Sequence, residues 1–435
     1  MDRIVVRGSG PLRGEVAVSG SKNSALALMA AALLGEGETQ LENVPRLRDV
    51  DAMLELLRAL GARADWLGPD SHEVRIDARN IHGREAPYDL VRKMRASFMV
   101  LGPLLARFGE ARVSEPGGCA IGVRPIDQHL KGFEALGSKI RLDHGYVEAS
   151  CPRLRGARVA FDLTTVNGTQ NVMMAACLAD GETVLENAAR EPEVVELAEV
   201  LLKMGADVRG AGTDRLVIRG VRSMRGTRHR VSGDRIEAGT LLAAAVATRG
   251  DVCVTGVDPS VMESTLDKLR DCGAELETAP TWVRLRQPGR VQPTRIVTAP
   301  FPGFATDMQA QLMAALTVAD GASVVTERVF ENRFMHVPEL QRMGADIALA
   351  GRTAHVNGVR RLMGAPVMAT DLRASAGLIV AALAAEGDTV VNRVYHIDRG
   401  YERIEERLSA LGAVIRREDE KETSETGAVV LSGTA

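Results

Sequence analysis

The chain has 435 residues, of which 45% are hydrophobic, 26% are charged and 3% are aromatic. This balance is that of a folded globular protein, and it excludes collagen-like, mucin-like and disordered chains. The 54 basic and 57 acidic residues give a net charge of −3, so we expect no general affinity for nucleic acids or for anionic membranes.

The first residues and the cysteines favour a cytoplasmic protein. No apolar run reaches the roughly 18 residues that a membrane-spanning helix needs, and the start, MDRIVVRG, lacks the pattern of a secretory signal. The five cysteines have no CxxC spacing, so we expect reduced thiols rather than a disulfide framework or a structural zinc site.

Similar segments follow one another along the chain. The tripeptide Leu-Gly-Ala, or a close variant, recurs with its glycine at positions 61, 137, 205, 273, 344 and 412, at spacings of 76, 68, 68, 71 and 68 residues. Each segment begins with small apolar residues, as at 25–34 and 241–247, which is typical of a buried helix. A short alternating strand, a polar helix that ends at the glycine and a further strand or hairpin follow. One segment is therefore predicted to be roughly βαβαββ.

The arrangement of these segments indicates two lobes of three. Segments of about 70 residues are long for a solenoid, and no atypical capping segments stand at the ends, so closed lobes are favoured. The acidic run that begins at Glu418 is predicted to be a solvated tail.

The starts of the buried helices differ from segment to segment. Each begins with a polar residue of the capping type, and simple capping is the alternative interpretation for any one of them. Lys22, Arg95 and Arg373 also lie there, although cations near a helix N-terminus oppose the helix dipole. We therefore expect a bound anion at these helix starts.

A glycine-rich insertion, EPGGCAIGVRP, occupies residues 115–125. Lone cysteines are usually small buried hydrophobes, as expected for Cys177. Cys119 differs, because glycines flank it and Arg124 would favour its thiolate, so a reactive thiol is predicted.

Eight motifs resemble, in order, those of the enolpyruvyl transferase family, above all its branch that acts on UDP-N-acetylglucosamine. They are SGSKN at 19–23, MRAS at 94–97, PGGC at 116–119, RPID at 124–127, ENAAREPE at 186–193, TDMQAQ at 306–311, ENRF at 331–334 and YHIDRGYER at 395–403. The resemblance implies an inside-out α/β barrel of two lobes. Residues 22–231, with the Cys119 loop, would form one lobe, and residues 1–21 with 232–435 the other, including the acidic tail at 418–435.

The resemblance also implies a reaction. The enolpyruvyl group of phosphoenolpyruvate would pass to the 3′-hydroxyl of UDP-N-acetylglucosamine, with release of phosphate by addition and elimination. In the family this is the first committed step of peptidoglycan synthesis, in the cytoplasm. The implied partners are these two small molecules, and no metal or organic cofactor is implied.

The resemblance assigns chemical roles to individual residues. Cys119 would be the general acid toward C3 of phosphoenolpyruvate and the target of fosfomycin, and Asp307 the candidate base at the 3′-hydroxyl. The other catalytic residues would be Lys22 and Arg399. The groups expected to bind phosphoenolpyruvate are Lys22, Asn23, Arg124, Arg373 and Arg399.

A second set is expected to line the nucleotide-sugar or to support the site. The lining residues would be Arg95, Arg124, Pro125, Ile126, Asp127, Gln128, Thr164, Thr165, Val166, Asp307 and Val329, with His129, Arg333 and Asp371 as supporting residues. One departure stands out, because Leu163 occupies a position where some relatives carry a basic residue beside the UDP.

Two alternatives compete with this interpretation. The sister enzyme that acts on shikimate 3-phosphate shares the six-segment fold but lacks the PGGC loop and the YHIDRG run. A non-catalytic repeat scaffold would carry its cations in every segment, whereas Lys22, Cys119 and Asp307 each occur in one.

Overall fold

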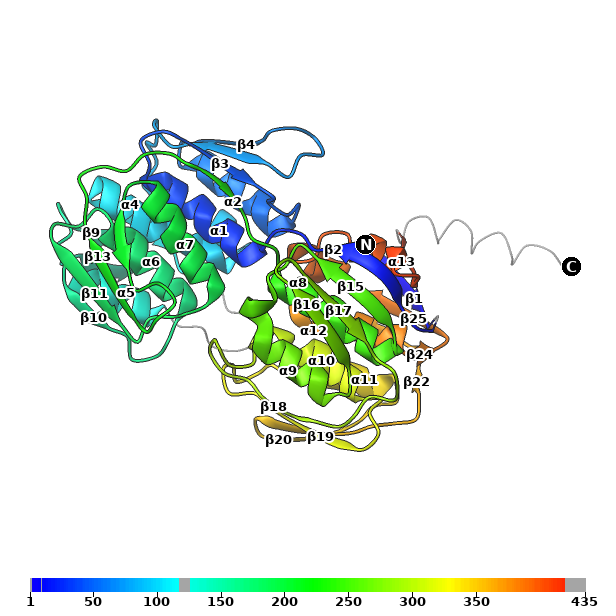
Figure 1. Ribbon diagram of the computed structural model, residues 1–435. Helices are drawn as coiled ribbons and strands as arrows, with labels where there is room; N and C mark the ends of the chain where they lie inside the picture. The colour runs from blue at the N-terminus through cyan, green and yellow to red at the C-terminus, as the bar shows by residue number, and fades with distance from the viewer. Residues whose placement is uncertain (1, 9, 117–125, 419–435) are drawn as a thin grey trace, which may run out of the picture. The chain divides into compact units, whose positions relative to one another are not determined.

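The computed structural model describes residues 2–8, 10–116 and 126–418 (Figure 1). The chain divides into two compact units, and we treat each by itself. Unit 2 contains residues 19–116 and 126–232, and unit 1 contains the described residues before 19 and after 232. Among the described residues, no helix has both the length and the apolar character needed to cross a membrane.

Unit 2 contains, within its described residues, three four-stranded sheets of one design. An outer strand is parallel to its neighbour, and the other strand pairs are antiparallel. Strand β14 comes from the end of the unit but pairs with β3 at its beginning. The sheets are β14(Arg228–Arg230)-β3(Glu38–Glu42)-β5(Val74–Asp77)-β4(Arg63–Trp66), β6(Glu85–Ala86)-β7(Glu110–Ser114)-β9(Tyr146–Ser150)-β8(Lys139–Asp143) and β10(Arg158–Ala160)-β11(Glu182–Glu186)-β13(Arg215–Arg219)-β12(Asp207–Arg209).

Unit 1 repeats this design with the first two strands of the chain built into it. Strand β2 is parallel to β15, and β1 lies antiparallel between β25 and β26. Figure 1 shows β1 beside β25, near helix α13 (Ile404–Ala410). The sheets are β16(Glu275–Ala279)-β17(Trp282–Arg286)-β15(Asp251–Thr255)-β2(Arg13–Ala17), β18(Arg295–Val297)-β19(Ala322–Thr326)-β21(Thr353–Asn357)-β20(Asp346–Ala350) and β23(Pro366–Met368)-β25(Asp388–Asn392)-β1(Arg3–Arg7)-β26(Val414–Glu418), with the pair β22(Leu362–Met363)-β24(Ala385–Glu386).

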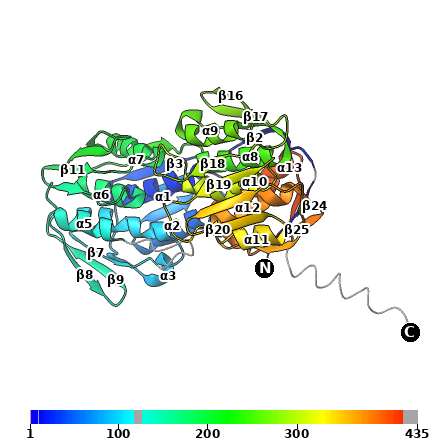
Figure 2. The same ribbon diagram turned by 90° about the horizontal axis from the view of Figure 1, so that it is seen from below.

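The apolar stretches of the sequence form helices that are buried along most of their length. They are rich in alanine and other small residues, which allows close packing, and α8, α10 and α12 pack against one another (Figure 2). These buried helices are α1(Lys22–Ala31), α4(Leu101–Phe108), α6(Val166–Ala176), α8(Arg235–Thr248), α10(Gln309–Leu316) and α12(Leu372–Leu383).

The remaining helices are amphipathic or short. The predicted C-terminal glycines are confirmed, because Gly61, Gly205 and their counterparts have φ values of 87° to 106°, which glycine adopts without strain. The amphipathic helices are α2(Arg48–Ala59), α5(Asp127–Ala135), α7(Pro192–Lys203), α9(Glu263–Asp271), α11(Val337–Arg342) and α13. The short ones are α3(Tyr88–Val91), η1(Ala32–Leu34), η2(Arg95–Val100), η3(Pro259–Met262), η4(Thr306–Met308) and η5(Val394–Arg399).

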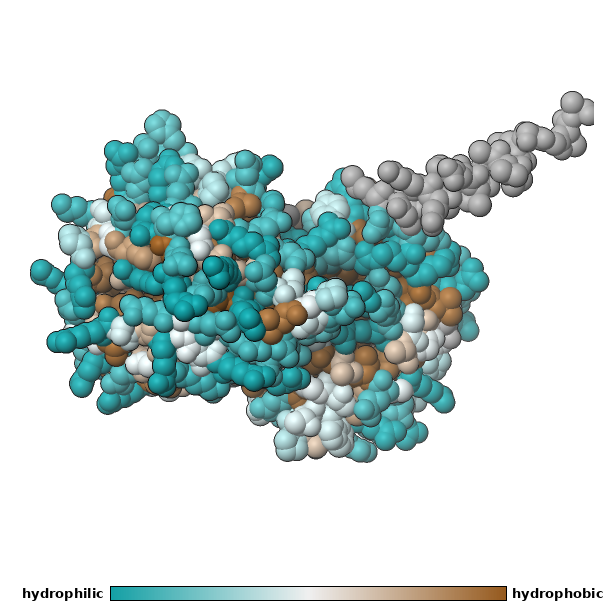
Figure 3. Space-filling view, turned by 90° about the horizontal axis from the view of Figure 1, so that it is seen from above, coloured by the Kyte–Doolittle hydropathy of each residue, from teal (hydrophilic) through white to brown (hydrophobic). Residues whose placement is uncertain are grey.

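Hydrophilic residues cover most of the face seen in Figure 3, and apolar residues are scattered among them. Exposed apolar side chains include Leu142, at 60%, and Leu163, at 68%. The order predicted for one segment is confirmed, for example by β6, α4, β7, α5, β8 and β9 in the second segment.

Candidate active site

The helix starts are capped by side chains in part of the molecule. Ser21, Thr165, Asp234 and Asp371 each accept backbone N–H groups from the first turn of α1, α6, α8 and α12. The turns η2 and η4, which precede α4 and α10, begin without such a bond. Asp307 therefore does not cap the helix that follows it, and its carboxylate has other partners.

In unit 2, Lys22 opens helix α1 and is held by a neighbouring helix. Its Nζ lies 2.6 Å from Oδ2 of Asp49, in the first turn of α2, and the two side chains are only 10% and 4% exposed. Next to it, Asn23 is exposed. The predicted phosphate-side cation thus has a buried counter-ion, which the resemblance did not include.

Two segments predicted to line the nucleotide-sugar meet in unit 2. The buried Gln128, in the first turn of α5, accepts the N–H of Asp162 at 2.8 Å and donates from Nε2 to Asp162 at 3.2 Å and to Asp127 at 2.8 Å. The hydroxyl of Thr164 donates to Asn187 at 2.8 Å. The start of α5 is consequently joined to Asp162, which lies two residues before the predicted 164–166 segment.

His129 and Arg95 lie behind these segments. His129 is buried, packs edge-on against Phe98 and places Nδ1 3.1 Å from the amide of Asn171. Burial, together with the charge of Arg95, lowers the pKa of His129 to about 3. The ring is therefore neutral at physiological pH, and it supports the start of α5 from the core.

In unit 1, Asp307 forms ion pairs with two arginines. Nη2 of Arg333 lies 2.7 Å from one carboxylate oxygen, and Arg373 reaches the other with Nη2 at 3.1 Å and Nε at 3.2 Å. The arginine side chains are 6% and 4% exposed, whereas that of Asp307 is 29% exposed. The guanidinium groups stabilise the ionised carboxylate, which remains the most accessible member of the cluster.

A buried carboxylate stands behind this cluster. Glu327 is 1% exposed and accepts the hydroxyls of Thr298 and Thr306 at 2.8 Å, as well as the N–H groups of Val329 and Phe330 at 2.8 and 3.1 Å. Thr306 in turn accepts Nη1 of Arg333 at 2.8 Å. Glu327 thereby fixes both Val329 and the arginine that faces Asp307.

Arg373 is charged despite its burial. Burial alone would lower the pKa of its guanidinium, but Tyr401 and the carboxylates of Asp307 and Asp234 raise it above its ordinary value. The guanidinium carbon lies 5.4 Å from the centre of the Tyr401 ring. Arg399, which is partly buried, ends η5, and that turn packs against α12.

The structure thus brings several of the predicted residues together within each unit. Asp307, Arg333 and Arg373 are joined directly in unit 1. In unit 2, Gln128 is joined to Asp127 and to Asp162, two residues before the 164–166 segment. The predictions for Cys119, Arg124 and Pro125 lie outside the described residues.

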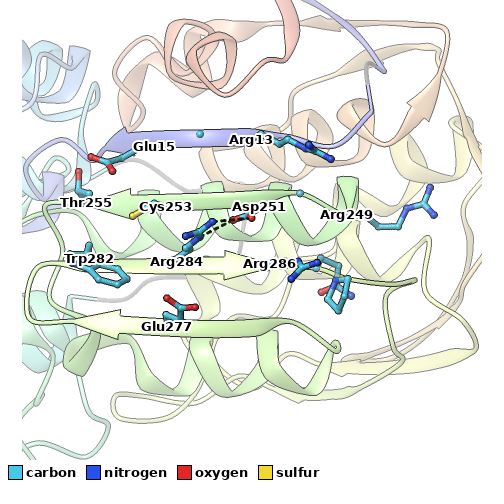
Figure 4. A pocket seen from close by; sticks show the side chains of 14 residues that line it. Arg13, Glu15, Arg249, Asp251, Cys253, Thr255, Glu277, Trp282, Arg284 and Arg286 are labelled. Atoms are coloured by element: carbon cyan, nitrogen blue, oxygen red, sulfur yellow. Dashed lines mark hydrogen bonds and ion pairs between the residues drawn. The ribbon is translucent and has the colours of Figure 1, made fainter.

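A pocket of about 950 Å³ lies elsewhere, on the outer face of the sheet β16-β17-β15-β2 (Figure 4). Acidic and basic side chains alternate across it, as where Arg284 pairs with Asp251 at 2.9 Å. None of the predicted site residues lines this pocket, and its ion pairs are those of a solvated sheet face.

The residues that bind and orient the predicted site residues were not identified from the sequence. From the sequence alone, Asp49 looks like an acidic residue that stabilises a helix N-terminus, and Glu327 looks like a residue at the end of a strand. The motif ENAAREPE contains Asn187, so a signal for that residue was present. Asp49 and Glu327 become visible only when distant segments meet.

Comparisons with known proteins give a consistent result. Residues 6–408 match the model of the family described as EPSP synthase (3-phosphoshikimate 1-carboxyvinyltransferase). The chain is similar to the enolpyruvyl transferase NikO from Streptomyces tendae, with 28% sequence identity, a TM-score of 0.86 and coverage of 96% of this chain and 98% of that chain. It is also similar to EPSP synthase from Acinetobacter baumannii, with 18% identity, a TM-score of 0.73 and coverage of 96% and 100%. The likenesses confirm the predicted α/β fold, and the second concerns the fold alone.

Proposed function

Because the chain belongs to the EPSP synthase family of enolpyruvyl transferases, we propose that it transfers the enolpyruvyl group of phosphoenolpyruvate to the 3′-hydroxyl of UDP-N-acetylglucosamine. The observation that carries the choice of acceptor is the pair of hydrogen bonds between Gln128 and Asp162. A nucleotide-sugar is a long ligand, and its binding requires polar groups from several segments at once. In a bacterium this activity would be the first committed step of peptidoglycan synthesis, in the cytoplasm.

The proposed acceptor site combines these two segments of unit 2. The backbone and side chains of 126–128 and 164–166 would contact the uridine and the diphosphate, with Arg95 as a nearby cation. Leu163 is 68% exposed and brings no charge. Contacts to the diphosphate would therefore come from backbone N–H groups and from arginines.

Asp307 is the proposed base. In the addition step, the 3′-oxygen bonds to C2 of phosphoenolpyruvate, the hydroxyl proton passes to the carboxylate, and Cys119 delivers a proton to C3. In the elimination step, the bond from C2 to the phosphate oxygen breaks, C3 returns a proton to the Cys119 thiolate to restore the double bond, and phosphate leaves with the proton that Asp307 had taken. The 29% exposure of Asp307 supports this role, because a substrate hydroxyl can approach a carboxylate whose partners, Arg333 and Arg373, are themselves buried.

Arg373 would exchange partners during binding. Its planar guanidinium suits a carboxylate in two-point contact, and its Nε and Nη2 already both bind one oxygen of Asp307. When the carboxylate of phosphoenolpyruvate takes this place, Asp307 loses one cation and becomes a stronger base. Lys22 and Arg399 would receive the phosphate, and for Lys22 this means a competition with Asp49.

A second acceptor is favoured by one observation, the description of the matching family, which names 3-phosphoshikimate. Shikimate 3-phosphate is shorter than a nucleotide-sugar and would leave the 164–166 segment unused. The PGGC and YHIDRG motifs support the nucleotide-sugar instead.

A panel of acceptors tests the proposal. Phosphate release from phosphoenolpyruvate is measured with UDP-N-acetylglucosamine, with its 3′-deoxy analogue and with shikimate 3-phosphate. We expect turnover with the first alone, and competitive inhibition by the second, because the analogue binds but lacks the nucleophile. Turnover with shikimate 3-phosphate alone would contradict the proposed acceptor and leave the enolpyruvyl transfer intact.

Fosfomycin tests the proposed acid. We expect it to add to Cys119 alone, as detected by mass mapping of peptides. Burial raises the pKa of both Cys177 and Cys272 to about 12, so their thiolates are scarce. Cys253 is the internal control, since it is the only cysteine among the described residues that is not buried. An adduct there instead of on Cys119 would contradict the assignment.

A further inference from the structure

Glu196 is a buried carboxylate with no part in the chemistry proposed above. It lies in the middle of α7 and is 7% exposed. A buried carboxylate is costly unless hydrogen bonds satisfy its oxygens. The hydrogen-bond partners of Glu196 therefore indicate its structural role.

The donors to Glu196 come from one short segment of unit 2. Ser232 donates its N–H to Oε1 at 2.8 Å and its hydroxyl to Oε2 at 2.6 Å, and Nε2 of His229 lies 3.0 Å from Oε1. Hydrogen bonds to the charged form hold the pKa of Glu196 below its ordinary value, although burial acts in the opposite direction. Glu196 is accordingly an anion that fixes residues 229–232.

His229 has a defined role in this cluster. Its Nδ1 lies 2.9 Å from Nζ of Lys203, at the end of α7. An ammonium group can only donate, so Nδ1 is the acceptor and Nε2 carries the proton given to Glu196. The imidazole ring thus connects Lys203 to the carboxylate of Glu196 through two hydrogen bonds.

The cluster leads to the start of helix α1. The carbonyl of Ser232 accepts the N–H of Ser21 at 2.7 Å, and the carbonyl of Ser21 accepts the N–H of Ala25 at 2.9 Å. Ser21 is also the cap of α1 and directly precedes Lys22. Residue 232 ends the part of the chain that belongs to unit 2, and residue 19 begins it.

We propose that Glu196 is a positioning residue that holds Lys22 in place through Ser232 and Ser21. It also ties together, within unit 2, the segments by which the chain enters and leaves that unit. This inference rests on the proposed function, because it matters for the reaction only if Lys22 binds the phosphate of phosphoenolpyruvate.

The variant Glu196→Gln tests the proposal. Glutamine has nearly the same size, but its NH2 group cannot accept the bond from the Ser232 hydroxyl. We expect the KM for phosphoenolpyruvate to rise at least tenfold, with a smaller change in kcat. Glu199→Gln is the matched control, since Glu199 is exposed on the same helix and its replacement should leave both constants unchanged.

Hydrogen exchange separates this inference from the proposed function. In Glu196→Gln, amides of the peptide spanning residues 19–34 should exchange at least tenfold faster, while a peptide from α10 exchanges as in the wild type. Unchanged exchange at 19–34 would overturn the inference. Faster exchange with an unchanged KM would overturn it too, since Lys22 would then not depend on this cluster. Failure of the acceptor assay in the wild type would instead reject the acceptor and leave the exchange result valid.

A milder variant covers the case in which Glu196→Gln does not fold. Ser232→Ala removes one hydroxyl but keeps the backbone N–H that donates to Glu196. We expect about a threefold rise in the KM for phosphoenolpyruvate, consistent with the loss of one of several hydrogen bonds. An unchanged KM, together with unchanged exchange at 19–34, would overturn the inference as well.

Discussion

The ion pairs formed by predicted site residues differ in exposure between the two units. In unit 2, Lys22 and Asp49 form a closed pair in which both side chains are nearly inaccessible. In unit 1, the cations Arg333 and Arg373 are buried, and the carboxylate of Asp307 is the accessible partner. The difference shows that one unit exposes its carboxylate, whereas the other buries both members of its ion pair, so under the proposed function an anionic ligand would have to compete with Asp49 for Lys22.

The largest effect is expected where the carboxylate is accessible. Asp307→Asn should lower kcat at least about a hundredfold, because asparagine cannot act as the proposed base. The unfolding free energy should fall by about 1 to 3 kcal/mol, since two buried arginines lose an anion. Turnover is measured per folded molecule, with the folded fraction taken from circular dichroism.

Asp320→Asn is the control for that substitution. Asp320 pairs with Arg290 at 2.9 Å, and both side chains are well exposed. Activity should be unchanged and stability should change by less than about 0.5 kcal/mol. If Asp307→Asn lowered kcat by less than tenfold, the base would have to be another residue.

For the buried Lys22–Asp49 ion pair in unit 2, the main expected effect of substitution is on stability. Asp49→Asn should cost about 3 kcal/mol of unfolding free energy, measured in urea, because Lys22 would keep a buried charge without its anion. The double variant Lys22→Met with Asp49→Leu should recover most of this loss and remain inactive, since a well-packed apolar pair can replace a buried ion pair. Glu55→Gln, in an exposed pair on the same helix, serves as control. An active double variant would show that Lys22 is structural only.

A smaller effect concerns the neutral histidine behind the segments of unit 2. Because the pKa of His129 falls from 6.5 to about 3 on folding, protons bind the unfolded chain preferentially between these values. The histidine therefore costs stability as the pH falls through this range, by about 2 kcal/mol between pH 7 and pH 5. In His129→Gln this part of the pH dependence should vanish. His144→Gln, at a side chain that is 90% exposed, should retain it, and equal slopes in both variants would refute the prediction.

The sequence predicted the repeated architecture well because its signals are local. The glycine at the end of each amphipathic helix and the small-residue helices follow from spacing alone, and the structure confirms both. The partners of the site residues could not be predicted in this way. Asp49, Glu327 and Glu196 resemble ordinary helix or strand residues, and their roles come from partners distant in sequence. The separation is 27 residues between Asp49 and Lys22, 21 between Glu327 and Thr306 and 36 between Glu196 and Ser232. Such contacts depend on how segments pack, which a local pattern does not encode.

Strand β1 has a consequence for how the protein is made. Its residues Ile4 and Val6 are fully buried between β25 and β26, and Arg3 lies opposite Glu418. A ribosome adds about 5 to 20 residues per second, so roughly 20 to 80 seconds pass before the strands that cover β1 are synthesised. Unit 2 can complete its sheets during this interval, while β1 still exposes its apolar side chains and unpaired backbone groups. Until β25 and β26 have left the ribosome, β1 is therefore expected to be open to pairing with other chains.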